Sequence, residues 1–301
     1  MLTARLAYAT AARAMDLVHL AWPRGRGHME RNLRHVLQTD DPDTLRHWSR
    51  RQLRRYGELL IDEARLQRLE AQDCLDALVT EQWPLMDAIL RDDRPLLFAL
   101  MHFGSWDVAG AALAARMRTV TPGRDFHVLV ETVGSAALDR ALQRNRRRLG
   151  MIPIDVERAP LSALRALRRG GAVGVLFDRP LGAAEPGLDL RLFDAPCRLP
   201  DGMARLALAS EARVIPLALQ RLPGPPFRFR PLVDFEFDYA PSGDRTADAQ
   251  SLTQRVLDVH AGWIAQAPDQ WYQFRPFFLE PAETSPPSPA SAGASHLGRP
   301  D

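Results

Sequence analysis

The sequence contains no lysine: all 39 basic residues are arginine, and they nearly balance the 37 acidic residues, for a net charge of +2. The absence of lysine excludes a Schiff base or any other lysine-dependent catalysis. A near-neutral chain in which aromatic side chains do not alternate with the arginines also argues against a nucleic acid partner.

Cysteine is scarce as well. The two cysteines, Cys74 and Cys197, each stand alone, with no CxxC pair and no clustered ligands. The sequence therefore predicts neither a disulfide framework nor a zinc site, and we expect no metal and no other cofactor. This usage is typical of a protein in a reducing compartment, on the cytosolic side of a membrane.

The apolar segment 6–22 is too polar for a membrane-spanning helix, because Arg13, Asp16 and His19 interrupt it. We expect residues 1–24 to form an amphipathic helix. Such a helix either lies on a membrane surface or covers the core of its own protein, and the segment alone does not distinguish the two.

Hydrophobic periodicity predicts an α/β fold. Two amphipathic helices are expected over residues 26–69, split at Asp40–Asp43, and another over residues 71–92. Strands and helices then alternate. The strands are expected at residues 95–101, 127–131, 152–154, 172–178, 214–219 and 227–237, with a hairpin near 188–192, and the helices at 136–149, 161–169, 203–210 and 247–267.

This alternation indicates one domain over residues 25–280, with a mixed, mostly parallel sheet and helices on both faces. The chain of 301 residues, 46% hydrophobic, is long enough for such a core. Residues 281–301 are rich in Pro, Ser, Ala and Gly and lack apolar periodicity, so we expect a disordered tail.

The segment His102-Phe-Gly-Ser-Trp-Asp107 lies between the apolar strand 95–101 and an alanine-rich helix. We expect His102 to end the strand and Asp107 to lie in the first turn of the helix, where its carboxylate reaches the imidazole. A carboxylate on one ring nitrogen leaves the other free to take a proton from a hydroxyl. The alternative is a core histidine and a carboxylate that caps the helix.

Three further charged residues lie at the ends of predicted strands, where open α/β sheets bind their ligands. Asp178 ends the strand at 172–178 and Arg179 follows it, and the Arg179 guanidinium suits a phosphate or a developing negative charge. Glu131 ends the strand at 127–131 and is expected to hold His102 or the acceptor. An internal salt bridge for Arg179 and an ordinary strand-end carboxylate for Glu131 are the alternatives.

Two weaker signals involve helices. The run Arg144-Asn-Arg-Arg-Arg148 is either a solvated surface or a basic patch that attracts an anionic donor or lipid. The turn Pro200-Asp-Gly202 opens a helix, and Gly202 there allows close approach of a backbone to an anion.

Taken in order, these segments resemble the bacterial family of lipid A late acyltransferases and phosphatidylinositol mannoside acyltransferases, within the lysophospholipid acyltransferase-like superfamily. The resemblance covers about residues 26–280. It rests on segments 30–33 with 56–60, His102 to Asp107, Glu131 with Arg146 and Gly150, residues 170–179, and residues 192–207, followed by a closing motif at 270–277. Asp178-Arg179 and the acidic residue of the first motif lean toward the mannoside branch.

The resemblance implies a glycerol-3-phosphate acyltransferase-like fold and an O-acyltransferase. His102 would deprotonate a hydroxyl of a lipid or glycolipid acceptor, which attacks the thioester of acyl-CoA or acyl-carrier protein, and Asp107 would orient His102. Glu131, Arg146, Asp178, Arg179 and Gly202 would line the substrate groove. The expected location is peripheral, at the cytoplasmic face of the bacterial inner membrane. A thioester hydrolase using the same pair of residues, or a non-catalytic lipid-binding protein, are the alternatives.

Overall fold

The computed structural model describes residues 2–131, 135–156, 159–223 and 227–279. Five helices of the described chain precede the first strand: α1 (Leu2–Ala21), α2 (Pro23–Leu37), α3 (Pro42–Leu66), α4 (Ala71–Asp76) and α5 (Trp83–Leu90). The expected break between α2 and α3 is confirmed. Pro42 occupies the first turn of α3, and the Asp41 side chain caps this helix by accepting from the Thr44 amide.

The centre of the molecule is a six-stranded sheet in the order β3-β2-β4-β1-β7-β8. Its strands are β1 (Leu96–Leu100), β2 (Phe126–Val130), β3 (Ile152–Asp155), β4 (Ala172–Leu176), β7 (Arg213–Arg221) and β8 (Phe229–Val233). Every pairing is parallel except that of β7 with β8. A separate antiparallel hairpin joins β5 (Leu188–Leu192) to β6 (Ala195–Leu199).

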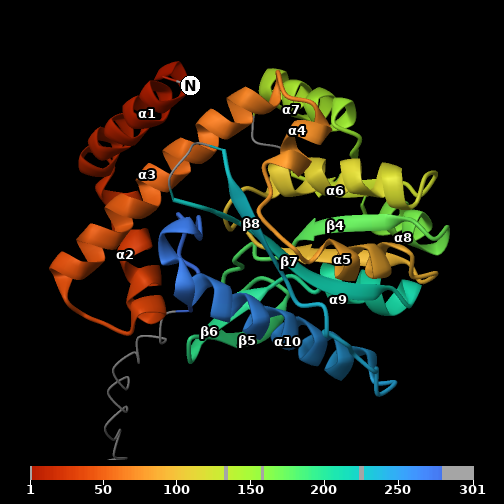
Figure 1. The fold of residues 1–301 in the computed structure, drawn as a ribbon. Coiled ribbons are helices and arrows are strands. Elements are labelled where there is room, and N and C mark those ends of the chain that lie inside the picture. Colours follow the sequence, from red (N-terminus) through yellow and green to blue (C-terminus); the bar gives the residue numbers. More distant parts are fainter. Residues whose placement is uncertain (1, 132–134, 157–158, 224–226, 280–301) are drawn as a thin grey trace, which may run out of the picture.

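Helices cover both faces of the sheet, as Figure 1 shows. On one side lie α4 and α6 (Trp106–Val120), with α7 (Ala136–Arg148) above them, and α5 packs against α6 on this side; on the other lie α8 (Ala159–Arg168), α9 (Gly202–Ser210) and α10 (Arg245–Gln266). Strand β1 is buried along its whole length, which is typical of a parallel strand covered on both faces. The predicted α/β class is confirmed.

Two predicted elements differ from the structure. The helix expected over 71–92 is two helices, since Pro84 lies in the first turn of α5 and a turn in which the Thr80 hydroxyl accepts from the Gln82 amide precedes this helix. The strand expected at 227–237 is only Phe229–Val233; it starts later than expected because Phe227 has a positive φ of 63°, which an extended strand does not allow. The tail predicted at 281–301 lies outside the described residues.

Helix α1 packs along α3 (Figure 1). The buried Tyr8 hydroxyl donates to Asp62 at 2.5 Å, and the buried His19 ring lies 2.9 Å from the Ser49 hydroxyl. One face of the predicted amphipathic helix is therefore part of the folded domain. None of the helices in the described ranges is long and apolar enough to cross a bilayer.

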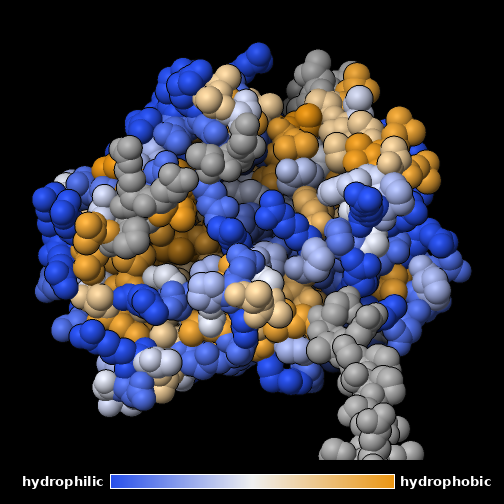
Figure 2. Space-filling model, turned by 180° about the vertical axis from the view of Figure 1, so that it is seen from behind, coloured by the Kyte–Doolittle hydropathy of each residue, from blue (hydrophilic) through white to orange (hydrophobic). Residues whose placement is uncertain are grey.

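The opposite face of α1 exposes leucines. Leu6, Leu17 and Leu20 are each at least 67% exposed, and their helical spacing puts them within about 60° of one another. Figure 2, which views the molecule from behind, shows apolar side chains gathered over α1 at the upper right. This exposed apolar stripe needs a functional explanation, because a domain gains nothing by leaving it in water.

Candidate active site

His102 lies just beyond the end of β1, in a tight loop that leads into α6. The loop turns at Gly104, whose φ is +62°. An added Cβ at Gly104 would collide with the Leu219 carbonyl, so only glycine fits this turn. The amide of Ser105 donates to that same carbonyl at 3.1 Å, which ties the loop to β7.

The imidazole of His102 is held by Asp178, at 2.7 Å between Nδ1 and Oδ1. The backbone amide of His102 also donates to both oxygens of this carboxylate, at 3.1 and 3.0 Å. The parallel register explains the contact. Leu100 of β1 is paired with Leu176 of β4, so the residues two positions further along, His102 and Asp178, emerge side by side at the carboxyl edge of the sheet.

Asp178 is fully buried, and the side-chain amide of Gln273 donates to its second oxygen at 2.8 Å. Burial opposes ionisation of this carboxyl. The charge of the facing imidazole and the hydrogen bonds from His102 and Gln273 outweigh it, so the pKa of Asp178 lies below its ordinary value. Asp178 is therefore an ionised acceptor, which keeps the proton of a neutral His102 on Nδ1.

The other nitrogen of His102 faces outward. The side chain is 36% exposed, and Nε2 has no hydrogen-bonding partner among the described residues. Burial lowers the pKa of His102, but the negative charge of Asp178, with a smaller contribution from Glu131, raises it above its ordinary value. Trp106 packs edge-on against the ring at 5.2 Å between centroids. The arrangement is that of a general base with one free lone pair.

The expected contact between Asp107 and His102 is wrong. Asp107 does lie in the first turn of α6, but it forms a two-pronged ion pair with Arg146 of α7, at 2.6 Å to Nε and 2.8 Å to Nη2. Both side chains are largely buried. Because the guanidinium occupies both carboxylate oxygens, Asp107 fastens α7 to α6 instead of orienting the imidazole.

The remaining predicted residues divide into two groups. Arg179 and Glu131 form an ion pair, with 3.8 Å between Nη1 and Oε1, and both side chains are about half exposed. This pair lies beside His102 and Asp178. Gly202 begins α9, and no described atom lies within 4 Å of a Cβ added there, so the space beside its backbone is open. No interaction in the described structure links Gly202 to His102, and its approach to an anion stays a prediction.

Sequence reasoning missed the role of the C-terminal strap, residues 270–277. The Tyr272 amide donates to the His102 carbonyl at 2.7 Å, and Gln273 holds Asp178. Asn32 of α2 anchors the strap: its side-chain amide donates to the Gln273 carbonyl, and its oxygen accepts from the Phe277 amide. The two motifs that contain these residues were visible in the sequence, but nothing there showed that they meet.

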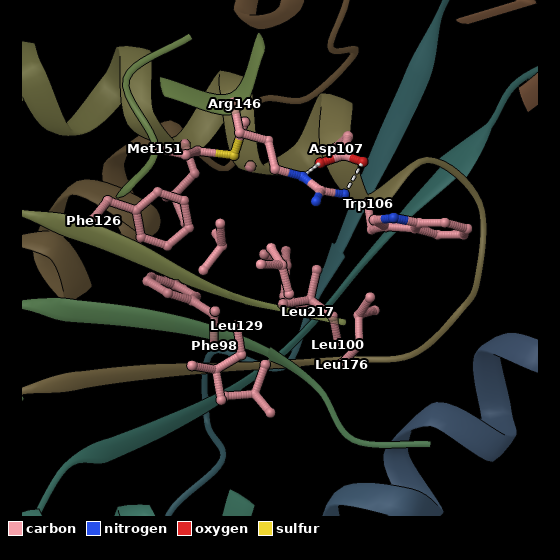
Figure 3. A pocket seen from close by; sticks show the side chains of 16 residues that line it. Phe98, Leu100, Trp106, Asp107, Phe126, Leu129, Arg146, Met151, Leu176 and Leu217 are labelled. Atoms are coloured by element: carbon pink, nitrogen blue, oxygen red, sulfur yellow. Dashed lines mark hydrogen bonds and ion pairs between the residues drawn. The ribbon is translucent and has the colours of Figure 1, made fainter. Parts of the chain in front are cut away.

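An apolar cavity lies between the sheet and α6 (Figure 3), and one of its lining residues, Trp106, packs on the ring of His102. It encloses about 460 Å³ of empty space, part of it continuous with solvent. Its lining includes Trp106, Leu100 and Leu176, the last two lying two residues before His102 and Asp178. In Figure 3, Phe126 and Met151 lie at the opposite end from Trp106, and the Asp107–Arg146 pair forms one polar edge.

Within the described ranges, no group of three or more His, Cys, Asp or Glu side chains is arranged to hold a metal ion. Both cysteines are buried, and burial raises the pKa of each thiol to about 12. Neither thiol is therefore a ready nucleophile at neutral pH.

The sequence is similar to those of known acyltransferases. A profile of the family described as bacterial lipid A biosynthesis acyltransferase matches residues 4–280. A phosphatidylinositol mannoside acyltransferase of Mycobacterium tuberculosis (strain CDC 1551 / Oshkosh) is 29% identical over 199 residues, which is 64% of this chain and 58% of that protein. One of Mycolicibacterium smegmatis (strain ATCC 700084 / mc(2)155) is 28% identical over 268 residues, covering 85% of this chain and 80% of that protein.

Proposed function

The chain belongs to the bacterial lipid A biosynthesis acyltransferase family, and from this premise we propose that it is an O-acyltransferase that moves a fatty acyl chain from a thioester donor to a hydroxyl of a membrane glycolipid. The observation that carries the proposal is the pair of His102 and Asp178 beside an apolar cavity. A base with a free nitrogen and an apolar chamber next to it are the two parts that acyl transfer requires.

The chemistry runs in two steps. Nε2 of His102 takes the proton of the acceptor hydroxyl while its oxygen attacks the thioester carbonyl, and Asp178 stabilises the resulting imidazolium. The tetrahedral intermediate then breaks its carbon–sulfur bond. The departing thiolate takes the proton from His102, which leaves an ester, a free thiol and a neutral base. No enzyme nucleophile is needed.

The cavity supplies a place for the acyl chain. Its walls from Phe98, Leu100 and Phe126 are apolar, and Trp106, which lines it, packs on the His102 ring, so a chain that enters beside Trp106 leaves its carbonyl near His102. The exposed Arg179 and Glu131 lie at the same edge of the sheet. They are suited to polar groups of the donor or acceptor, Arg179 to a phosphate and Glu131 to a sugar hydroxyl.

The donor is acyl-CoA or acyl-carrier protein, and the acceptor is a lipid A-like or phosphoinositol mannoside-like glycolipid. The names of the two mycobacterial relatives favour the mannoside class. The aligned segment covers only 58% of the M. tuberculosis protein, so the acceptor of this chain is inferred from the shared segment alone.

The protein works at a membrane surface, on the cytoplasmic face of the inner membrane. Support comes from the exposed leucines of α1, which an interfacial helix would bury among lipids. Lipid acceptors and acylated products remain in the bilayer, so an enzyme that attaches there meets its substrate without extracting it.

Transfer of radiolabelled acyl groups from acyl-CoA and from acyl-carrier protein to extracted membrane lipids tests the function. We expect a labelled lipid with the wild type and at least about a 10²–10⁴-fold slower reaction with His102→Ala. His47→Ala, which changes an exposed histidine on α3, is the matched control and keeps full activity. Labelled fatty acid without labelled lipid would identify a hydrolase, and no product that depends on His102 would identify a binding protein.

A further inference from the structure

A second apolar cavity lies on the same face of the sheet as the first. It is bounded by α5, α6, β7 and β8, and its lining includes Trp83, Met86, Ala112 and Val233. It holds about 460 Å³ of empty space, part of it continuous with solvent, as the first does, and its lining is almost entirely apolar. The two cavities lie side by side along the sheet, because the first extends over β2, β4 and β1 and the second over β7 and β8.

Two leucines line both cavities. Leu113 projects from α6 and Leu217 from β7, and both are at least 94% buried. Figure 3 shows Leu217 near Leu100 and Leu176, toward the end of the first cavity that holds Trp106. Leu113 lies seven residues further along α6 than Trp106, a distance of about 10 Å. Together the two side chains form a wall between the cavities.

We propose that Leu113 and Leu217 are specificity-determining residues that limit the length of the acyl chain by closing the second cavity to it. This inference rests on the proposed function, because it takes the first cavity as the site of the donor's acyl chain. A chain that fills the first cavity to Phe126 and Met151 has no further apolar space while the wall is present. Without the two isobutyl groups, the chain can bend into the second cavity and bury additional methylenes.

The test is a binding ladder that does not depend on turnover. S-alkyl phosphopantetheine thioethers of increasing chain length carry the arm that acyl-CoA and acyl-carrier protein share, and they cannot be transferred. For the wild type, we expect affinity to rise about fourfold per methylene until the first cavity is full and then to level off. For the double variant Leu113→Ala with Leu217→Ala, we expect the affinity to keep rising by about fourfold per methylene at chain lengths beyond the wild-type limit.

Two other variants isolate the wall. Val233→Phe fills the second cavity from β8, and in the double-variant background it restores the wild-type limit. Met86→Ala enlarges the second cavity while the wall stays in place, so the limit stays where it is in the wild type. The single Leu113→Ala and Leu217→Ala variants, which remove less of the core, give the measurement if the double variant does not fold.

An unchanged limit in folded wall variants would overturn the inference and leave the proposed function intact. A shifted limit in a protein that transfers no acyl group to any lipid would support the wall and count against the proposed function. Failure of the wild type to bind any thioether would overturn both the wall and the assignment of the donor cavity.

Discussion

Replacing Asp178 by Asn tests which carboxylate supports the base. The substitution keeps the size of the side chain and one acceptor oxygen for the His102 amide, but it removes the charge that lies 2.7 Å from the imidazole. It also allows the imidazole to place its proton on Nε2, where a base needs a lone pair. The sequence motif alone would assign this role to Asp107, so the two substitutions have opposite predicted outcomes.

The magnitude follows from the contact. With an effective dielectric constant of about 20, unit charges at 2.7 Å attract by about 6 kcal/mol. Solvent reaches a ring that is 36% exposed and weakens this attraction, so we expect a loss of about 4–5 kcal/mol of transition-state stabilisation. This corresponds to a fall in kcat/KM of about 10³–10⁴-fold, similar to the loss expected when an aspartate that orients a catalytic histidine is replaced.

The assay is acyl transfer as a function of pH, together with thermal unfolding. Asp178→Asn is expected to lower the rate and to move the inflection in kcat/KM to lower pH, since the charge that raises the pKa of His102 is gone. Asp107→Asn is the comparison: it weakens the ion pair with Arg146, which lowers the melting temperature and raises KM for the donor but leaves that inflection in place. A collapse in turnover with Asp107→Asn, and a rate within about tenfold of wild type with Asp178→Asn, would refute the reasoning.

Four further predictions follow from the structure. Because the pKa of His102 is raised, its basic form accumulates only above the ordinary value of about 6.5, so kcat/KM of the wild type rises with pH and its inflection lies above that value. Gly104→Ala places a methyl against the Leu219 carbonyl at a positive φ, and we expect it to lower the free energy of unfolding by more than about 2 kcal/mol, measured by denaturant titration. Leu17→Glu with Leu20→Glu is expected to reduce sedimentation with anionic phospholipid vesicles while the melting temperature changes little, because both side chains are exposed; unchanged sedimentation would remove α1 from the membrane surface. Deleting residues 1–24 instead lowers the melting temperature, since it uncovers the part of α3 on which α1 packs.

Much of the fold could be predicted because its signals are local. The apolar run at 95–101 is continuous and short, which is typical of a buried strand, and the structure has strand β1 there. The break between α2 and α3 was visible in Asp41 and Pro42. The prediction of one helix over residues 71–92 was wrong because the helical spacing of apolar residues continues through the turn between α4 and α5. Hydrophobic periodicity alone does not reveal such a turn.

The site could be predicted in its parts but not in its connections. His102, Asp178 and Glu131 were all expected at strand ends, and the structure puts them at one edge of the sheet. The assignment of Asp107 to the imidazole failed because nearness in sequence was taken for nearness in space. Arg146, 39 positions further along the chain, occupies that carboxylate instead.

The sequence by itself determined most of the strands and helices, that a histidine ends the central strand, and that lysine and paired cysteines take no part. Those properties depend on residue type and on spacing within one segment. Only the tertiary structure decided that Asp178 orients His102, that Asn32 and Gln273 support the pair, and that Leu113 and Leu217 divide two cavities. Each of these contacts joins segments far apart in the chain, and it is set by strand order, register and the path of α6 over the sheet, which no local pattern encodes.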